Sequence, residues 1–509
     1  MNTVPQGSAD ASLTIKGSDS DIIVKREILG QFIEHLGLCI ENGIWTYDQS
    51  TKEMLEPPLD RVRKDLFDAI DALHVPLLRW PGGCFSDTYH WKDGIGPREH
   101  RPKRKNRAWG GIKNIIGPLG PEERNHFGTD EFITLCEKLG TKAMINVNYG
   151  SGTPEEAAEW VQHVGGTRAP IWGIANEIYG WWETGHAKTP DDYARRYLEF
   201  VTPMKAADPT IKLLAVGHNW NSNWNRTVLA GIKGNVDYLS IHLYFQNPNP
   251  LKLISKNPIP RTETMYYCEI NSSRAYERLI EQTEADIDAV YVGATDKCKI
   301  AFDEWNIWTS FKQIVRADTP SYNLVDGLWC ALIINLLIRH TARIGIANYA
   351  QLVNVIGLIL TYDDVIVLTP QYHVFKLFGD LMQERLMQIA VTCDLVASKK
   401  FTNEFPAESA PTIDAAATIS DDGNTIAVFV INKHFKESRR VTINFNENVD
   451  KRSLSNGTAW ILTHDDPFAA NTRENPQEIA LQEFAIQAST PLTFDIPAHS
   501  LIGIRLQLQ

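Results

Sequence analysis

Short runs of hydrophobic residues recur between Ile28 and Val353, and stretches with helical spacing separate them. Continuous apolar runs of this length are typical of strands buried on both faces of a parallel sheet. The pattern predicts eight strands, over Ile28–His35, Pro76–Gly82, Lys142–Tyr149, Ile171–Ile178, Lys212–His218, Tyr238–Phe245, Lys299–Asn306 and Ile344–Val353.

Amphipathic helices are predicted between these strands. In Asp60–Leu73, apolar residues recur every three or four positions, which is the spacing of one helix face. Thr153–His163 opens with Thr, Pro and two Glu, an order that supplies a cap, an N-terminal proline and acidic residues near the positive end of the helix dipole. The other predicted helices are Thr129–Leu139, Thr189–Met204, Tyr276–Val290 and Tyr322–His340.

Eight strands alternating with helices predict an α/β fold, the (β/α)₈ or TIM barrel. A doubly wound sheet is the alternative arrangement of such elements. However, no G-x-G-x-x-G motif follows the first predicted strand, so a dinucleotide site is unsupported.

The pattern changes after about residue 385, where the segments become short and mostly strand-like. Turn residues such as the run Asp421–Asn424 separate them, which predicts an antiparallel, jelly-roll-like β-sandwich. Ser12–Val24 is also strand-like, and we expect it to join that sheet. The predicted domains are therefore an N-terminal strand segment at 1–25, a barrel at 26–384 and a sandwich at 385–509.

Composition narrows the classes of function. Lys and Arg number 50 against 62 Asp and Glu, and the net charge of −12 makes a nucleic-acid partner a poor expectation. The longest apolar stretch, Leu328–Ile338, is too short for a membrane span and predicts a buried helix. The seven cysteines form no C-x-x-C motif, and the N-terminus lacks the features of a secretory signal. We therefore expect a cytoplasmic protein.

Polar residues gather at the C-terminal ends of the predicted strands, where barrel enzymes place their active sites. One such residue could be purely structural, but all eight strand ends carry them. The residues singled out at or just after these ends are Glu34, Arg79, Cys84, Asn176, Glu177, His242, Tyr244, Glu304 and Gln351.

Two of these residues, Glu177 and Glu304, suit glycoside cleavage. That reaction needs one carboxylic acid of raised pKa to protonate the leaving oxygen and one ionised carboxylate to attack or to activate water. The alternative for either residue is a surface position after a strand. The chain has no H-E-x-x-H motif and no G-x-S-x-G motif. We therefore expect neither a metal nor an organic cofactor.

Longer motifs identify a family. They are GQFIEHLG at Gly30–Gly37, RWPGGCFSDTYHWKDGIGPREHRP at Arg79–Pro102, HFGTDEF at His126–Phe132, Asn176-Glu177, the run Asp303–Asn306, ANYAQLVNV at Ala347–Val355 and LTPQYHVF at Leu368–Phe375. With these motifs the chain resembles the α-L-arabinofuranosidases of glycoside hydrolase family 51 over nearly its whole length. It departs from the family at Ala175, where glycine is usual, and over Ile178–Trp182.

The resemblance implies a retaining double displacement, with Glu177 as acid/base and Glu304 as nucleophile. Retention predicts carboxyl groups about 5–5.5 Å apart. The resemblance also implies a set of residues that bind the furanoside: Glu34, Cys84, Asn176, Tyr244 and Gln351. Arg79 and His242 are expected to orient the two carboxylates. Four tryptophans are candidates either for outer sugar subsites or for packing: Trp109, Trp181, Trp182 and Trp308.

The implied activity is an exo-acting α-L-arabinofuranosidase that removes terminal arabinofuranose from arabinoxylan or arabinan oligosaccharides. The resemblance also implies a homo-oligomer, commonly a hexamer. Two alternatives remain: an endo-β-1,4-glucanase or xylanase of the same family, and a non-catalytic carbohydrate-binding protein. A basic run from Arg98 to Arg107 is interpreted as a solvated loop or subunit contact rather than a nucleic-acid site.

Overall fold

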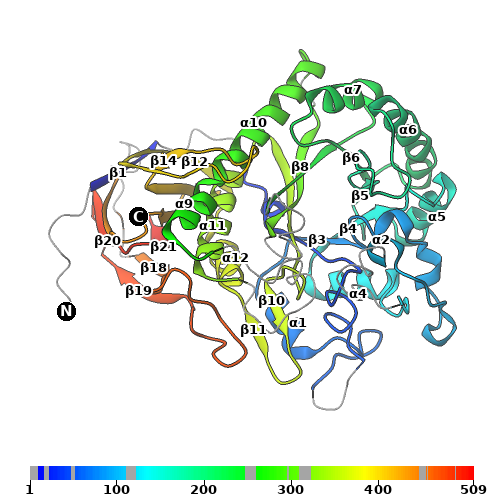
Figure 1. Ribbon diagram of the computed structural model, residues 1–509, viewed down its shortest axis with the longest axis horizontal. Coiled ribbons are helices and arrows are strands. Elements are labelled where there is room, and N and C mark those ends of the chain that lie inside the picture. Colours follow the sequence, from blue (N-terminus) through cyan, green and yellow to red (C-terminus); the bar gives the residue numbers. More distant parts are fainter. Residues whose placement is uncertain are drawn as a thin grey trace.

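The computed structural model describes residues 10–16, 22–47, 52–110, 122–246, 260–294, 297–308, 322–445, 454, 457–487 and 489–508. Two regions lie side by side (Figure 1). A barrel ringed by helices occupies one end of the molecule, and a layered β-sheet region occupies the other.

Eight parallel strands close into a barrel, so the predicted α/β barrel is confirmed. The strands are β2 (Gly30–Phe32), β3 (Leu77–Trp80), β4 (Lys142–Val147), β5 (Ile171–Ile174), β6 (Lys212–Val216), β7 (Tyr238–Gln246), β8 (Lys299–Trp308) and β9 (Ile344–Ala350). Pairing of β2 with β9 closes the ring. Several strands end earlier than predicted, because the polar residues that follow leave the strand ladder and face the centre of the barrel rim.

The six predicted helices are found within a few residues of their expected positions: α1 (Lys64–Asp71), α4 (Thr129–Leu139), α5 (Pro154–Val164), α6 (Pro190–Ala207), α10 (Ser273–Val290) and α11 (Leu324–Arg339). The cap predicted for α5 is present, because Thr153 Oγ1 accepts a hydrogen bond from the Glu156 amide at 3.2 Å. The other helical segments are η1 (Arg26–Leu29), η2 (Ser86–Thr88), η3 (Trp91–Gly94), η4 (Arg98–His100), α2 (Arg107–Gly110), α7 (Ser222–Ile232), α9 (Glu263–Asn271) and α12 (Pro370–Leu381).

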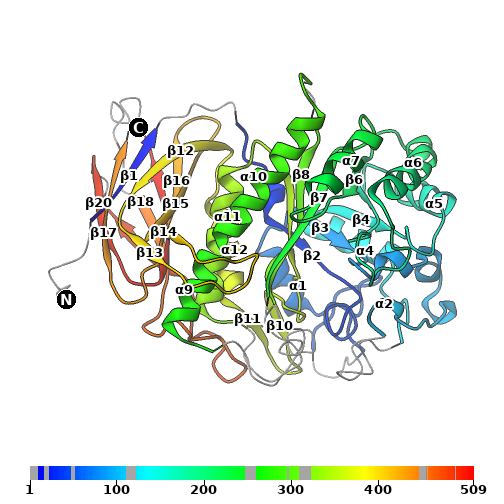
Figure 2. The same ribbon diagram turned by 45° about the horizontal axis from the view of Figure 1, so that its top comes forward.

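A continuous set of nine strands forms the second region. In spatial order they are β19 (Gln482–Ile486), β18 (Gly457–Leu462), β21 (Ser500–Gln507), β16 (Thr425–Asn432), β15 (Ile413–Ile419), β12 (Arg385–Thr392), β1 (Asp10–Lys16), β17 (Arg439–Phe445) and β20 (Leu492–Ile496). The set is mixed rather than purely antiparallel, because β1 runs parallel to β17. Figure 2 shows β1, in blue, among the strands of the C-terminal part of the chain. The domain limits at 25 and 384 stay predictions.

β12 joins the two layers of this region. Its first residues pair with β15, and its later residues pair with β1. A separate apolar core, which includes Leu13, Val428 and Ile443, fills the space between the layers. Two short hairpins complete the described strands: β10 (Ile359–Thr361) with β11 (Ile366–Leu368), and β13 (Leu395–Ala397) with β14 (Ser409–Pro411).

Helices α11 and α12 lie between the barrel and the sheet region. α11 is buried from Leu324 to Ile338, as predicted for its apolar sequence. On α12, the ring of Phe378 stacks on Phe429 of β16 at 4.0 Å between centroids. A side chain at Gly503 would come within 2.9 Å of two leucines of α12, so glycine permits this close approach. Among the described residues, no helix is long and apolar enough to cross a membrane.

Candidate active site

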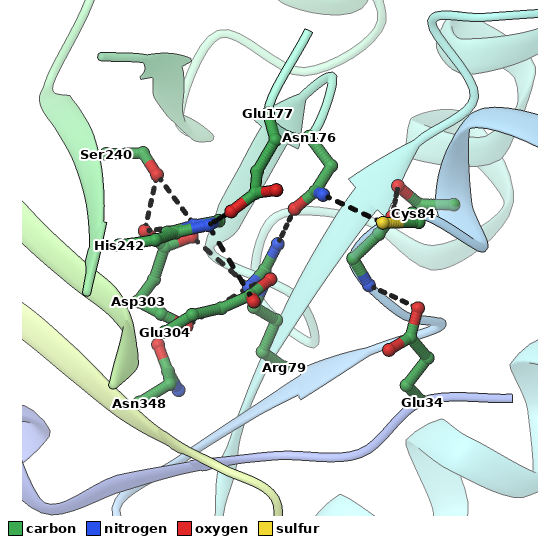
Figure 3. A network of polar contacts seen from close by, with 12 residues as sticks. Glu34, Arg79, Cys84, Asn176, Glu177, Ser240, His242, Asp303, Glu304 and Asn348 are labelled. Atoms are coloured by element: carbon green, nitrogen blue, oxygen red, sulfur yellow. Dashed lines mark hydrogen bonds and ion pairs between the residues drawn. The ribbon is translucent and has the colours of Figure 1, made fainter. Parts of the chain in front are cut away.

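Glu304 lies inside the barrel rim on β8, where its exposed fraction is 7%. The Arg79 guanidinium donates to its Oε1 at 2.8 Å, and the Tyr244 hydroxyl donates to its Oε2 at 2.7 Å. A Cβ at Gly83 would lie 2.6 Å from Glu304 Oε1, so the glycine pair of the WPGGC motif lets the backbone approach the carboxylate. Arg79 itself is 1% exposed and comes from β3 (Figure 3).

A bulge in β8 places Asp303 and Glu304 in the same network. Ser240 pairs with Ala301 but His242 pairs with Glu304, so β8 carries one residue more than β7 over this interval. Consecutive residues of a regular strand point to opposite faces, and a bulge changes this alternation. Both carboxylates consequently reach Arg79, with Asp303 Oδ2 at 3.5 Å and Glu304 Oε1 at 2.8 Å.

Glu177 follows β5 on a turn with left-handed backbone. Ala175 has φ +79° and Glu177 has φ +34°, in a region that L-residues other than glycine seldom adopt. The turn removes Asn176 and Glu177 from the strand ladder and directs them to the centre of the rim. It also explains why glycine suits position 175 in the family.

His242 connects Glu177 to Asp303. Its Nδ1 lies 2.9 Å from Glu177 Oε1, and its Nε2 lies 3.4 Å from Asp303 Oδ1. The Ser240 hydroxyl donates to the same Asp303 oxygen at 2.5 Å. Burial would lower the pKa of His242, but the negative charges of Glu304 and Asp303 raise it to about 10. His242 is therefore a cation at neutral pH.

The charge of His242 decides the protonation of its neighbour. Burial raises the pKa of Glu177, but the hydrogen bond and charge of His242 bring the net pKa below the ordinary value. This differs from the raised pKa that sequence reasoning assigned to a glycosidase acid. The reason is that the partner on β7 is an imidazolium, which favours the carboxylate form.

Glu34 lies across the rim from His242. Its Oε1 accepts from the amides of Gly83 and Phe85, each at 3.1 Å, and its Oε2 accepts from Gln351 Nε2 at 3.2 Å. Burial and the charge of Glu304 raise the pKa of Glu34 to about 7. Gln351 Oε1 is buried and has no hydrogen-bond partner among the described residues. A ligand hydroxyl would satisfy this acceptor.

Asn176 is held from both ends of its amide. Its Oδ1 accepts from Arg79 Nη2 at 2.8 Å, and its Nδ2 donates to Glu183 Oε1 at 3.1 Å and lies 3.8 Å from Cys84 Sγ. The backbone amide of Asn176 donates to Asp87 Oδ2 at 3.1 Å. These contacts fix the orientation of the amide above Glu304.

Sequence reasoning missed Asp87 and Glu183. Burial, followed by the charges of Asp87 and Glu177, raises the pKa of Glu183 to about 9, and burial raises the pKa of Asp87 to about 8. Asp87 lies within the motif that starts at Arg79, and Glu183 lies six residues after Glu177. Proximity to those motifs was the only signal that could have found them.

A cavity of about 810 Å³ opens above these groups, a size that suits a sugar ligand. Seven of the nine predicted site residues line it. The other two contact lining residues, Arg79 through Glu304 and Asn176 through Cys84. The seven are Glu34, Cys84, Glu177, His242, Tyr244, Glu304 and Gln351. The four candidate tryptophans also line it, and two of them are strongly exposed, Trp181 at 83% and Trp182 at 51%.

One atom each of Glu177, His242 and Glu304 lie within 4.8 Å of one another, a spacing that a metal ion could also use. The hydrogen bond between His242 and Glu177 accounts for this spacing without an ion. Three residues of the basic run have acidic partners: Arg98 pairs with Asp60, Arg101 with Glu131 and Arg104 with Asp93.

A closed parallel barrel with a close pair of glutamates at its C-terminal rim has the arrangement of a barrel glycosidase. Comparisons with known proteins agree. Family models match at two places, described as the α-L-arabinofuranosidase 1 domain at residues 69–167 and the α-L-arabinofuranosidase C-terminal domain at residues 303–500.

Relatives match over the full length. The chain is 30% identical to an intracellular exo-α-L-arabinofuranosidase of Bacteroides ovatus, covering 98% of this chain and 96% of the relative. Among solved structures, the α-L-arabinofuranosidase of Thermotoga petrophila matches with a TM-score of 0.83 and 32% identity, and that of Thermotoga maritima, solved as an arabinose complex, with 0.81 and 31%. Each covers 98% of this chain and 100% of the solved chain. The chain belongs to the α-L-arabinofuranosidases of glycoside hydrolase family 51.

Proposed function

We propose that this α-L-arabinofuranosidase is exo-acting and retaining, and that it removes terminal α-L-arabinofuranosyl residues from arabinoxylan or arabinan oligosaccharides. One observation supports the proposal that the reaction retains the anomeric configuration. A carboxyl oxygen of Glu177 and one of Glu304 lie within 4.8 Å of each other. Retaining glycosidases need this short separation, whereas inverting enzymes leave about 6.5–9.5 Å for a water molecule.

In the first step, Glu304 attacks the anomeric carbon while Glu177 protonates the departing oxygen. Arg79 and Tyr244 hold the attacking carboxylate in place through the hydrogen bonds given above. In the second step, Glu177 removes a proton from water, which then cleaves the bond between the sugar and Glu304. Esterification removes the negative charge of Glu304, and this loss lowers the pKa of Glu177 and suits it to act as base.

The furanoside ring would lie between Glu34, Gln351 and Tyr244. Glu34 and the free oxygen of Gln351 accept hydrogen bonds from sugar hydroxyls. Asn176 contacts the 2-hydroxyl beside the nucleophile, where a hydrogen bond strengthens in the transition state. Cys84 is a small neighbour against which the ring packs.

The test is hydrolysis of 4-nitrophenyl α-L-arabinofuranoside by the purified chain, followed by proton NMR. We expect rapid release with the α-anomer of arabinose appearing first. The 4-nitrophenyl β-D-xyloside and a cellulose oligomer serve as comparison substrates. Cleavage of the cellulose oligomer without turnover of the furanoside would instead support an endoglucanase, and initial formation of the β-anomer would refute retention.

Three further properties belong to this proposal. The exo action agrees with that of the Bacteroides ovatus relative, an intracellular exo-α-L-arabinofuranosidase. A cytoplasmic location agrees with that intracellular relative and with seven cysteines that form no disulfide. A hexamer follows from the family resemblance alone. Light scattering of the purified chain tests the assembly, and a monomer would refute it.

A further inference from the structure

A loop of the C-terminal part of the chain reaches the active-site cavity. The loop spans residues 398–408 and connects β13 to β14, which pair with each other in an antiparallel hairpin. Its residue Glu404 lines the same cavity as Glu177 and Glu304. All other described residues that line this cavity precede residue 357 and belong to the barrel.

The loop is firmly attached to the barrel rim. Phe401 stacks on Phe245 of β7 at 4.7 Å between ring centroids, and Phe405 packs edge-on against the same ring at 5.1 Å. Phe405 is 2% exposed. Within the loop, Thr402 Oγ1 accepts the amides of Glu404 and Phe405 at 3.1 and 3.0 Å. These contacts present Glu404 at a fixed place.

Helices of the barrel hold the two ends of the loop. Asn271 Nδ2 donates to the Val396 carbonyl at 3.1 Å, and Cys268 Sγ donates to the Lys399 carbonyl at 3.2 Å. Arg278 forms an ion pair with Glu408. The loop therefore has partners on β7, α9 and α10.

The Glu404 side chain is exposed at the cavity mouth, next to Trp220. Partial burial raises its pKa. The Trp220 Nε1 is buried and has no hydrogen-bond partner among the described residues. Among the described residues, no Lys, Arg or His forms an ion pair with Glu404. A carboxylate with this environment can accept hydrogen bonds from hydroxyl groups of a ligand.

The positions of Glu404 and Trp220 indicate which part of the substrate they contact. Trp220 follows β6, and β6 lies opposite β2 in the ring of eight strands. Glu34 follows β2 on the side that would hold the furanoside. The leaving oxygen must face Glu177 after β5, so the departing group extends toward the neighbouring loop after β6.

We propose that Glu404 and Trp220 form a binding subsite for the sugar that leaves the enzyme. The indole face packs against the sugar ring, and the carboxylate accepts hydrogen bonds from its hydroxyls. The negative charge of Glu404 disfavours a uronic acid at this place, so the subsite selects a neutral sugar. This inference rests on the proposed function, since it assigns the leaving group of that reaction.

The test compares two leaving groups in Glu404→Ala, Glu404→Gln and the wild type. One substrate is an arabinofuranosyl xylo-oligosaccharide, whose leaving group carries hydroxyls, and the other is the 4-nitrophenyl furanoside, whose leaving group carries none. For Glu404→Ala we expect kcat/KM on the oligosaccharide to fall about tenfold, as for loss of one hydrogen bond to a charged group. Turnover of the nitrophenyl substrate should stay within about twofold.

Controls separate the subsite from folding and from the activity itself. Asn403→Ala changes an exposed neighbour that does not line the cavity, and it should match the wild type on both substrates. Glu404→Gln should improve turnover of an oligosaccharide with a glucuronic-acid leaving sugar relative to the neutral one. Equal losses on both main substrates, or no loss on either, would overturn the subsite. Failure of the wild type on the furanoside would instead refute the proposed function.

Discussion

The two catalytic candidates share one cavity but have different surroundings. Glu304 lies within β8 and receives hydrogen bonds from Arg79, whose charge is permanent, and from Tyr244. Glu177 lies on a left-handed turn, its side chain is 20% exposed, and its close partner is His242, which can itself titrate. A carboxylate that must remain ionised is held by a permanent cation. The carboxylate that must gain and lose a proton is partly exposed and lies beside a histidine whose positive charge depends on the neighbouring carboxylates Glu304 and Asp303.

The largest expected effect is that of Glu304→Ala. Without the nucleophile no covalent intermediate can form, and we expect kcat to fall at least about 10³-fold. Steady-state kinetics with the nitrophenyl furanoside measures the loss. Glu159→Gln, an exposed carboxylate outside the cavity, is the control. Near-normal turnover by the alanine variant would remove the nucleophile assignment.

Glu177→Ala should show a loss that depends on the leaving group. A nitrophenol departs without much protonation, whereas a sugar hydroxyl needs the acid, so we expect about 10²–10⁴-fold loss for oligosaccharides and a smaller loss for the nitrophenyl substrate. Comparison of kcat/KM over a series of leaving groups measures this difference. An equal loss for all of them would contradict the acid role.

His242→Asn tests the influence of the imidazolium on Glu177. The value of kcat/KM falls as Glu177 loses its proton, so the pKa of Glu177 sets the alkaline limb of the pH profile. His242 lowers that pKa, and its removal should move the limb to higher pH. The control is His90→Asn, which changes a histidine outside the catalytic network. An unmoved alkaline limb would show that His242 does not control this protonation.

The smallest expected effect concerns stability. Because Glu183 has a pKa of about 9 in the fold, the native state keeps a proton that the unfolded state loses above pH about 4.5. The free energy of unfolding therefore falls as pH rises from about 5 to 8. The side chain of the Glu183→Gln variant cannot ionise. Its free energy of unfolding, measured by urea denaturation, should therefore fall less over that pH range than that of the wild type. Parallel curves for the two proteins would contradict the raised pKa.

The barrel could be predicted because its strands are continuous apolar runs, which can be recognised from the local sequence alone. The start of β12 was harder to recognise: only part of this strand is buried, since it passes from one layer to the other. α7 did carry a signal, with Asn221 as cap and apolar residues such as Trp224 and Val228 on one face, but it was not predicted.

The sequence motifs contain the nine candidate residues, and the structure places all nine at one rim of the barrel. Sequence analysis nevertheless missed three carboxyl groups around the site. Asp87 lies in the one-turn helix η2 and Glu183 in a loop, neither has a periodic pattern, and only tertiary packing buries them. Glu404 comes after all the barrel strands in the sequence, and no local pattern shows that its loop packs back against the barrel. Polar groups on irregular backbone can therefore be placed only when the packing of distant segments is known.

The place of β1 between β12 and β17 has a consequence for synthesis on the ribosome. Among the described strands, β1 is translated before the barrel, but both of its neighbours in the sheet are translated after the whole barrel. The nascent chain must therefore keep this segment unpaired while the barrel emerges, and the sheet can close around it only after β12 and β17 have been translated.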